Sequence, residues 1–458
     1  MLLRLLSSIH PRRQPWITRQ SYSHELVTAF TFPVAMALIE GGVIGVLARK
    51  TFQAGPLLFA TIMAAPMFAN VTSFAWARLA RCRRKVRFIN VLQVAILAGI
   101  AAIALLPADP VGAVLLTALV VLCRCLLAGI LTIRSTVWRM NYPRRVRGRV
   151  TSKLAVINSI IMTAAPVIGY ALLDHDATAF RWFYPASIVI AMGGVAAFSR
   201  VRLRGERALL RYESDPAAQP QPHGTPASLY EYDPAAGRDN FWTVLKRDHL
   251  FRRYMKWQFC GGIATMMGDV VMIYFIVEVT RGKPHEYVTS VALSTAIPML
   301  LVTCTVPLWA RYFDRVHVAR LRARQGLLWV LSQLLNWVGA WCSSLALLGI
   351  ARVVLGVTRG AGMLAWTLGH NDFADRRLVA LYMGIHVTLT GVRGAIGPFL
   401  AMMLYSGWSS DALAGLGLTM PAFDGIGHHV FLLCAALSAV ATVGFTRLDR
   451  AIGRGQQK

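Results

Sequence analysis

Apolar blocks of about twenty residues recur along the whole chain, and short polar segments rich in arginine separate them. A helix of that length spans about 30 Å, which is the thickness of the hydrocarbon core of a bilayer. Most blocks are apolar on every side, whereas a surface helix of a soluble protein keeps one polar face. The pattern therefore predicts twelve transmembrane helices, at residues 26–47, 55–76, 88–106, 112–133, 154–173, 182–199, 257–279, 288–308, 325–342, 346–367, 380–405 and 429–446.

The composition agrees with this fold class, an all-α membrane protein. The chain has 458 residues, of which 56% are hydrophobic and 15% are charged. A soluble protein of this length could not bury so much apolar surface, because a single core stops growing well before that size. The seven cysteines show no CxxC pair and no metal-ligand spacing, so we expect no disulfide framework, no metal site and no cofactor.

Basic residues are distributed unevenly between the two sides of the predicted bundle. With the N-terminus inside, most of the 48 Lys and Arg residues fall in inside segments. The outside loops then hold only Arg49, Lys50, Arg181, Arg281 and Lys283. Because positive charge in short loops fixes orientation, we expect a protein of the inner (cytoplasmic) membrane with both termini in the cytoplasm. The net charge of +27 follows from basic loops facing an anionic leaflet and requires no nucleic-acid partner.

The chain divides into two similar halves of six predicted helices, residues 1–199 and 253–458. Between them lies a polar stretch, 200–252, whose Pro, Ala and Gln content is typical of a flexible cytoplasmic linker. Parallel repeats of this kind are a transporter architecture. Residues in corresponding helices recur at a nearly constant spacing: Trp76-Ala77-Arg78 with Trp309-Ala310-Arg311, Arg124 with Arg352, Trp138 with Trp366, and Pro166 with Pro398.

A loop motif is present in both halves. After the eighth predicted helix, residues 310–317 read ARYFDRVH, in which Asp314 and Arg315 match the D-R pair of the loop G-x-x-x-D-R-x-G-R. After the second helix, residues 77–85 read ARLARCRRK, a degenerate copy with Arg81 in the place of the aspartate. The tenth helix adds Arg352 and Gly356 in an R-x-x-x-G pattern. On these residues the sequence resembles the major facilitator superfamily (MFS) over essentially its whole length.

The resemblance implies a secondary transporter that moves a small molecule by alternating access and works as a monomer. It also implies that the first, fourth, seventh and tenth helices line a central cavity with the substrate site near the midplane. The gating loops would then hold the motif residues Arg78, Arg81, Arg311, Asp314 and Arg315.

Ionisable side chains at bilayer depth are costly unless they are paired or hydrated, so each one suggests a functional site. Each half carries one acid in its first helix, Glu40 or Asp269, and one arginine in its fourth, Arg124 or Arg352. Two interpretations stay open. Either these are structural ion pairs, or one acid binds and releases a proton as the contact with its arginine changes, which would couple proton movement to transport.

Three further arginines lie within the predicted helices. Arg359 follows Arg352 by two helical turns on the same face, where it either forms a basic stripe for an anionic substrate or snorkels at a helix end. We favour the snorkelling interpretation. Arg134 is expected to contact headgroups or the basic loop, and Arg393, between small neighbours, has no predicted role.

Other classes of function have little support in the sequence. The chain contains no GxxxxGK[ST], HExxH or GxSxG motif, so neither an ATP-driven pump nor an enzyme is expected. Arg81 in the degenerate loop leaves one alternative, a transporter-like protein that no longer transports and acts as a sensor or assembly partner. Acids at bilayer depth in both halves favour a transporter, and the excess of arginine in the helices favours an anionic substrate.

Overall fold

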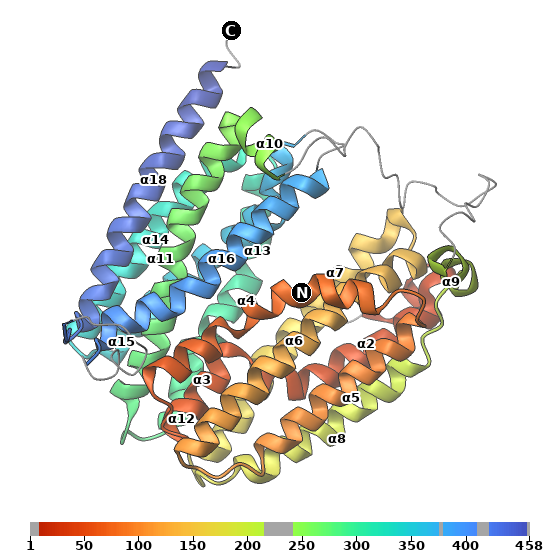
Figure 1. Cartoon of the computed structure of the whole chain (residues 1–458), viewed down its shortest axis with the longest axis horizontal. Coiled ribbons are helices and arrows are strands. Elements are labelled where there is room, and N and C mark those ends of the chain that lie inside the picture. The colour runs from red at the N-terminus through yellow and green to blue at the C-terminus, as the bar shows by residue number, and fades with distance from the viewer. Residues whose placement is uncertain (1–8, 215–240, 375–378, 410–420, 456–458) are drawn as a thin grey trace. The chain divides into compact units, whose positions relative to one another are not determined.

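The computed structural model describes residues 9–214, 241–374, 379–409 and 421–455, which are almost entirely helical (Figure 1). The chain forms two compact units. The N-terminal unit comprises Met1–Gln53 and Phe68–Ala227, and the C-terminal unit comprises Ala54–Met67 and Ser228–Lys458.

Eight helices follow one another through the first half of the chain. They are α2 (Trp16–Leu38), α3 (Gly41–Lys50), α4 (Pro56–Leu79), α5 (Lys85–Ile103), α6 (Pro110–Asn141), α7 (Arg144–Leu173), α8 (Phe180–Ser199) and α9 (Glu206–Ser214). The first part of α4 belongs to the C-terminal unit and the rest to the N-terminal unit.

The second half of the chain is built in the same way. Its helices are α10 (Phe241–Arg247), α11 (His249–Thr280), α12 (Glu286–Val291), the π-helical turn η4 (Ala292–Ala296), α13 (Ile297–Phe313), α14 (Val318–Trp341), α15 (Leu345–Leu368), α16 (Val379–Ser406) and α18 (Val430–Gly455). The elements α12, η4 and α13 run on as one span, Glu286–Phe313.

The predicted all-α membrane fold is confirmed. Within the described residues, eleven helical segments are long and apolar enough to cross a membrane. The remaining predicted span, 325–342, forms most of α14, a helix of 24 residues. It is not among the eleven. The helix begins earlier than predicted and its first turns carry Arg320, Arg322 and Arg324, which lower its mean hydropathy.

The pattern of helix packing repeats from one unit to the other. In the N-terminal unit, α2 packs on α7 and α8, while α5 packs on α6 and α8. In the C-terminal unit, α11 packs on α16 and α18, while α14 packs on α15 and α18. In both units the first spanning helix contacts the fifth and sixth, and the third contacts the fourth and sixth. The two halves therefore share one pattern of helix contacts.

The predicted linker, 200–252, is helical at both ends, where α9 and α10 lie. Its Pro- and Gln-rich centre falls at 215–240, outside the described residues. Glu213 of α9 accepts hydrogen bonds from Lys85 Nζ at 2.7 Å and from the backbone N–H of Cys82 at 2.8 Å. The start of the linker is therefore fixed to the loop that follows α4.

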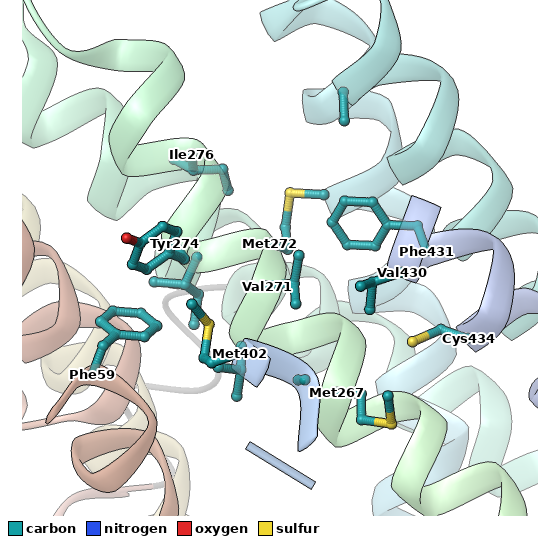
Figure 2. Packing of buried hydrophobic residues seen from close by; sticks show 14 of the residues in the cluster. Phe59, Met267, Val271, Met272, Tyr274, Ile276, Met402, Val430, Phe431 and Cys434 are labelled. Atoms are coloured by element: carbon teal, nitrogen blue, oxygen red, sulfur yellow. The ribbon is translucent and has the colours of Figure 1, made fainter. Parts of the chain in front are cut away.

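The core of the C-terminal unit gathers around the middle of α11. Met267, Val271 and Met272 of this helix pack with Val430 and Phe431 of α18 (Figure 2). On another side of α11, the ring of Tyr274 contacts Phe59 of α4 edge-on, with 5.3 Å between the ring centres. This apolar packing surrounds the turn of α11 that carries Asp269.

Candidate functional site

Glu40 lies at a break in the first predicted membrane helix. The helix α2 ends at Leu38, and Glu40 has an extended backbone (φ −66°, ψ 138°) and forms the N-cap of α3. Two glycines follow it, Gly41 and Gly42, and glycine lowers the stability of a continuous helix. The segment is therefore two helices joined at the acid, with backbone carbonyls left over at the end of α2.

Arg124 of α6 satisfies the groups at this break. One of its terminal nitrogens, Nη2, lies 3.0 Å from the carboxylate of Glu40 and donates to the carbonyl oxygen of Ile39 at 2.7 Å. The arginine is buried, whereas the glutamate side chain remains partly accessible. The break thus combines a carboxylate, a guanidinium and a carbonyl that is bound by a side chain, as in the interrupted helices that form transporter sites.

Asp269 occupies the matching position in the C-terminal unit, but α11 is continuous there. The carboxylate lies 3.8 Å from Nη2 of Arg352 and accepts a short hydrogen bond from Arg359, both of α15. Arg352 is only 1% exposed, and its Nε and Nη1 have no hydrogen-bond partner in the described residues. Asp269 is therefore the counter-charge for both Arg352 and Arg359.

The position of Arg359 corrects the sequence-based expectation. We favoured a side chain that snorkels at a helix end, yet it binds Asp269. Seven residues separate Arg352 from Arg359, so both point from the same face of α15 and can share one partner. Arg359 also lines a cavity of about 410 Å³ inside the C-terminal unit.

Glu25 was missed by the sequence analysis. The first span was predicted to begin at residue 26, but α2 begins at Trp16, and Glu25 is completely buried in it. Its carboxylate accepts hydrogen bonds from Tyr142 Oη at 2.7 Å, Trp138 Nε1 at 2.5 Å and Arg134 Nη2 at 3.2 Å. The expectation that Arg134 contacts headgroups or the basic loop is thereby wrong. The three donors, Arg134, Trp138 and Tyr142, follow one another at intervals of four residues near the end of α6. That spacing could have indicated a buried acidic partner.

The loop-motif residues are placed at the ends of α4 and α13. Arg78 lies in the last turn of α4, and Arg81 is exposed in the turn that follows. Arg311, Asp314 and Arg315 are exposed at the end of α13, where, in the part of the chain that is described, their side chains form no ion pair. Nearby, Asp372 accepts a hydrogen bond from the backbone N–H of Val318 at 2.7 Å and so caps α14.

The ionisable groups at the two acid positions are carboxylates and guanidinium groups. These groups can form and break ion pairs, and the carboxylates can accept protons. No group of three potential metal ligands occurs among the described residues.

Solved structures of membrane transporters have a similar fold. Solved structures that the chain resembles include the nucleoside transporter NupG (TM-score 0.61, 12% identity, 95% of this chain and 99% of that one) and the peptide transporter POT in complex with sulfate (0.62, 13%, 96% and 96%). A bacterial homologue of the human lysosomal transporter Spinster, inward-facing and unoccupied, is also similar (0.60, 12%, 94% and 97%). At these identities the likeness shows the fold. A comparison with curated protein sequences returns no match.

The family follows from the sequence itself. The model of the Major Facilitator Superfamily matches residues 26–328, which is more than half of the chain. The chain belongs to this superfamily, as its loop motifs and repeat predicted, and it is a multi-pass membrane transporter rather than an enzyme.

Proposed function

We propose that this protein is a secondary active transporter that moves a small molecule by alternating access and couples it to protons through Glu40 or Asp269. The observation that carries the proposal is the pairing of an acid with an arginine at the same place in both halves. Both acids lie within membrane-spanning helices, and both carboxylates keep some accessible surface. An acid held this way can exchange its arginine for a proton when its surroundings change.

The charge distribution supports the finer parts of the proposal. Arginines outnumber acids in the spanning helices, which favours an anionic or carboxylate-bearing substrate. The basic loops favour an inner (cytoplasmic) membrane with both termini in the cytoplasm. Two exposed cysteines test that orientation, since Cys82 follows α4 and Cys342 follows α14. In intact cells a membrane-impermeant thiol reagent should label a protein whose only cysteine is Cys342 and spare one whose only cysteine is Cys82.

Proton coupling is tested in vesicles that contain the purified protein and a pH-sensitive dye. A panel of organic acids, peptides and nucleosides is added outside, and the internal pH is recorded for the wild type, Glu40→Gln and Asp269→Asn. Asp449→Asn serves as control, because Asp449 forms an ion pair with Arg320 away from these acids. We expect one compound to drive a pH change that one acid variant abolishes and the control keeps. Substrate uptake without any pH change in the wild type would refute the coupling.

A non-transporting sensor is the second candidate, and one observation favours it. The loop after α4 has Arg81 where the superfamily motif has an acid, and the loop is instead bound by Glu213 of α9. The vesicle experiment separates the two, since a sensor moves neither substrate nor protons with any member of the panel.

A further inference from the structure

Four arginines are buried in the described helices, and they fall into two groups. Arg124 and Arg352 each lie within 4 Å of a carboxylate oxygen. Arg322 of α14 and Arg393 of α16 are also buried, at 9% and 5% exposure, but neither forms an ion pair with any described residue. A buried cation without a counter-charge is strongly unfavourable, so these two positions need an explanation.

The hydrogen bonds of the two arginines leave part of each guanidinium unused. Arg322 donates from Nη1 to the side-chain oxygen of Gln325 at 3.1 Å, and Arg393 donates from Nη1 to the backbone carbonyl of Gln258. Both acceptors are neutral. The Nε of each arginine is buried and has no partner among the described residues, and the two positive charges repel each other. Both side chains therefore have donors free for a further acceptor.

These two arginines line the cavity of about 410 Å³ in the C-terminal unit. No described residue that lines the cavity is acidic. Ser438 lines it as well, a residue that is 3% exposed and whose buried hydroxyl has no hydrogen-bond partner among the described residues. Two buried guanidinium groups, each with donors to spare, and a buried hydroxyl form a preorganised set of donors for an oxyanion.

Four aromatic residues also belong to the wall. Trp257, Trp329, Trp366 and Phe445 line the same cavity, from α11, α14, α15 and α18. The volume lies within the range of small-molecule sites, which are usually apolar with a few convergent polar groups. A bare inorganic anion would leave this aromatic surface uncovered, whereas an organic acid with a flat apolar body would use both parts of the wall.

The internal repeat shows that the fold does not require these cations. At the spacing that relates Trp76 to Trp309, the residue equivalent to Arg322 is Ile89. At the spacing that relates Pro166 to Pro398, the residue equivalent to Arg393 is Ile161. The N-terminal unit makes the same helix pairs with isoleucine at both places. The arginines are thus an addition to the C-terminal unit.

We infer that the cavity of the C-terminal unit binds an aromatic organic monoanion, whose carboxylate is held between Arg322, Arg393 and Ser438 and whose ring packs on the tryptophans. The anion supplies the missing counter-charge, and the guanidinium groups supply charge-assisted hydrogen bonds. This inference names a ligand class for the cavity, which neither Glu40 nor Asp269 lines, although Arg359, the partner of Asp269, forms part of its wall. It does not depend on proton coupling.

The test is binding of 3-phenylpropanoate to the full chain in nanodiscs of neutral phosphatidylcholine. Binding is followed by titration calorimetry and by tryptophan fluorescence, since three tryptophans line the cavity. We expect a Kd below about 1 mM for the wild type, and a loss of on the order of tenfold or more in Arg322→Gln and in Arg393→Gln. The matched control is Arg324→Gln, an exposed arginine of the same helix that stacks on Tyr312, and it should bind like the wild type.

Three further arms isolate the chemistry. The neutral 3-phenylpropanamide and inorganic phosphate should each bind on the order of tenfold more weakly than 3-phenylpropanoate, because one lacks the charge and the other lacks the ring. The melting temperature of ligand-free Arg393→Gln should match or exceed that of the wild type, since an uncompensated cation has been removed. A marked fall in that temperature would assign the arginine a structural role and overturn the proposal.

The proposal is also overturned if none of the probes binds, if both arginine variants bind like the wild type, or if the amide or phosphate binds as well as the acid. Nanodiscs containing phosphatidylglycerol test for a lipid as the source of the anion. Suppression of 3-phenylpropanoate binding by that lipid would make the arginine pair a headgroup site, which again overturns the proposal. Unchanged binding in those nanodiscs supports it.

Discussion

Glu40 with Arg124 in the N-terminal unit and Asp269 with Arg352 in the C-terminal unit occupy equivalent positions, yet their surroundings differ. The N-terminal acid lies at a helix break, and its arginine bonds both the carboxylate and the carbonyl of Ile39. The C-terminal acid lies in a continuous helix, where no backbone carbonyl is free. Arg352 consequently has one contact at 3.8 Å, while Arg359 makes the shorter bond to the same acid.

The residues after each acid account for the difference. Two glycines follow Glu40, whereas Val270 and Val271 follow Asp269 and are buried in the core of the C-terminal unit. Burial keeps α11 helical there, while the glycines favour a break in the first helix. The break gives Arg124 a second acceptor, so the N-terminal pair depends less on its acid than the C-terminal cluster does.

The largest expected effect comes from removing the acids. Asp269→Asn leaves two arginines without a counter-charge, one of them fully buried, and should lower the free energy of unfolding by about 3–5 kcal/mol. In Glu40→Gln, Arg124 keeps its hydrogen bond to the carbonyl of Ile39, so the free energy of unfolding should fall by only about 1–2 kcal/mol. Both values are measured by unfolding of the purified protein in a denaturing detergent. Equal losses would show that the helix break does not protect Arg124.

A second comparison concerns the acids near the start of the first helix in each half. Glu25 is completely buried and accepts three side-chain hydrogen bonds, so Glu25→Gln should destabilise the protein by about 2–3 kcal/mol. Asp248 accepts one bond from Tyr382 and caps α11 at Phe251, so Asp248→Asn should cost about 1 kcal/mol or less, because asparagine also caps. The same unfolding measurement applies, and the reverse order would contradict this account of Glu25.

Removing the arginines should reverse the order of the two halves. Arg124→Gln leaves the Glu40 carboxylate and the Ile39 carbonyl unpaired and should cost about 1–3 kcal/mol. Arg352→Gln leaves Asp269 bound to Arg359 and removes a poorly satisfied buried cation, so the loss should stay below about 1 kcal/mol. Melting temperatures of the two variants, compared with Arg359→Gln, decide this. A larger loss for Arg352 would mean that the 3.8 Å contact is stronger than its length indicates.

The smallest expected effect concerns His317, in the loop before the third helix of the C-terminal half. Burial lowers the pKa of His317, although Asp372 nearby acts in the opposite direction. Its Nδ1 accepts a hydrogen bond from the N–H of Ala319. This bond requires an unprotonated Nδ1, so it is lost when the ring is protonated. Above the ordinary pKa of about 6.5 the residue adds no pH dependence, and below it the unfolded chain binds the proton more readily. Stability should therefore decrease by less than about 1 kcal/mol as the pH falls from 7 to 5, and His317→Gln should remove that part of the slope. An unchanged slope in the variant would exclude His317 as its source.

Much of this protein could be predicted along the chain. Hydrophobic length located the spanning helices, and the spaced matches located the repeat, because both depend on residues near one another or on copies of one pattern. The same spacing aligned Glu40 with Asp269 and Arg124 with Arg352. The predictions failed at Arg134, Arg359 and Glu25. Glu25 precedes the apolar block proper, so hydropathy placed it outside the membrane helix, although α2 extends ten residues further and buries it.

The sequence by itself determined the membrane fold, the superfamily and the acids and arginines that each half carries at bilayer depth. The tertiary structure decided which of these charges meet. Arg359 reaches Asp269, while Arg322 and Arg393 line one cavity and form no ion pair within the described part of the chain. Such contacts join helices that are far apart in the chain, and they depend on how each helix is rotated about its own axis. That rotation is set by side-chain packing between helices, which no local pattern of residues records.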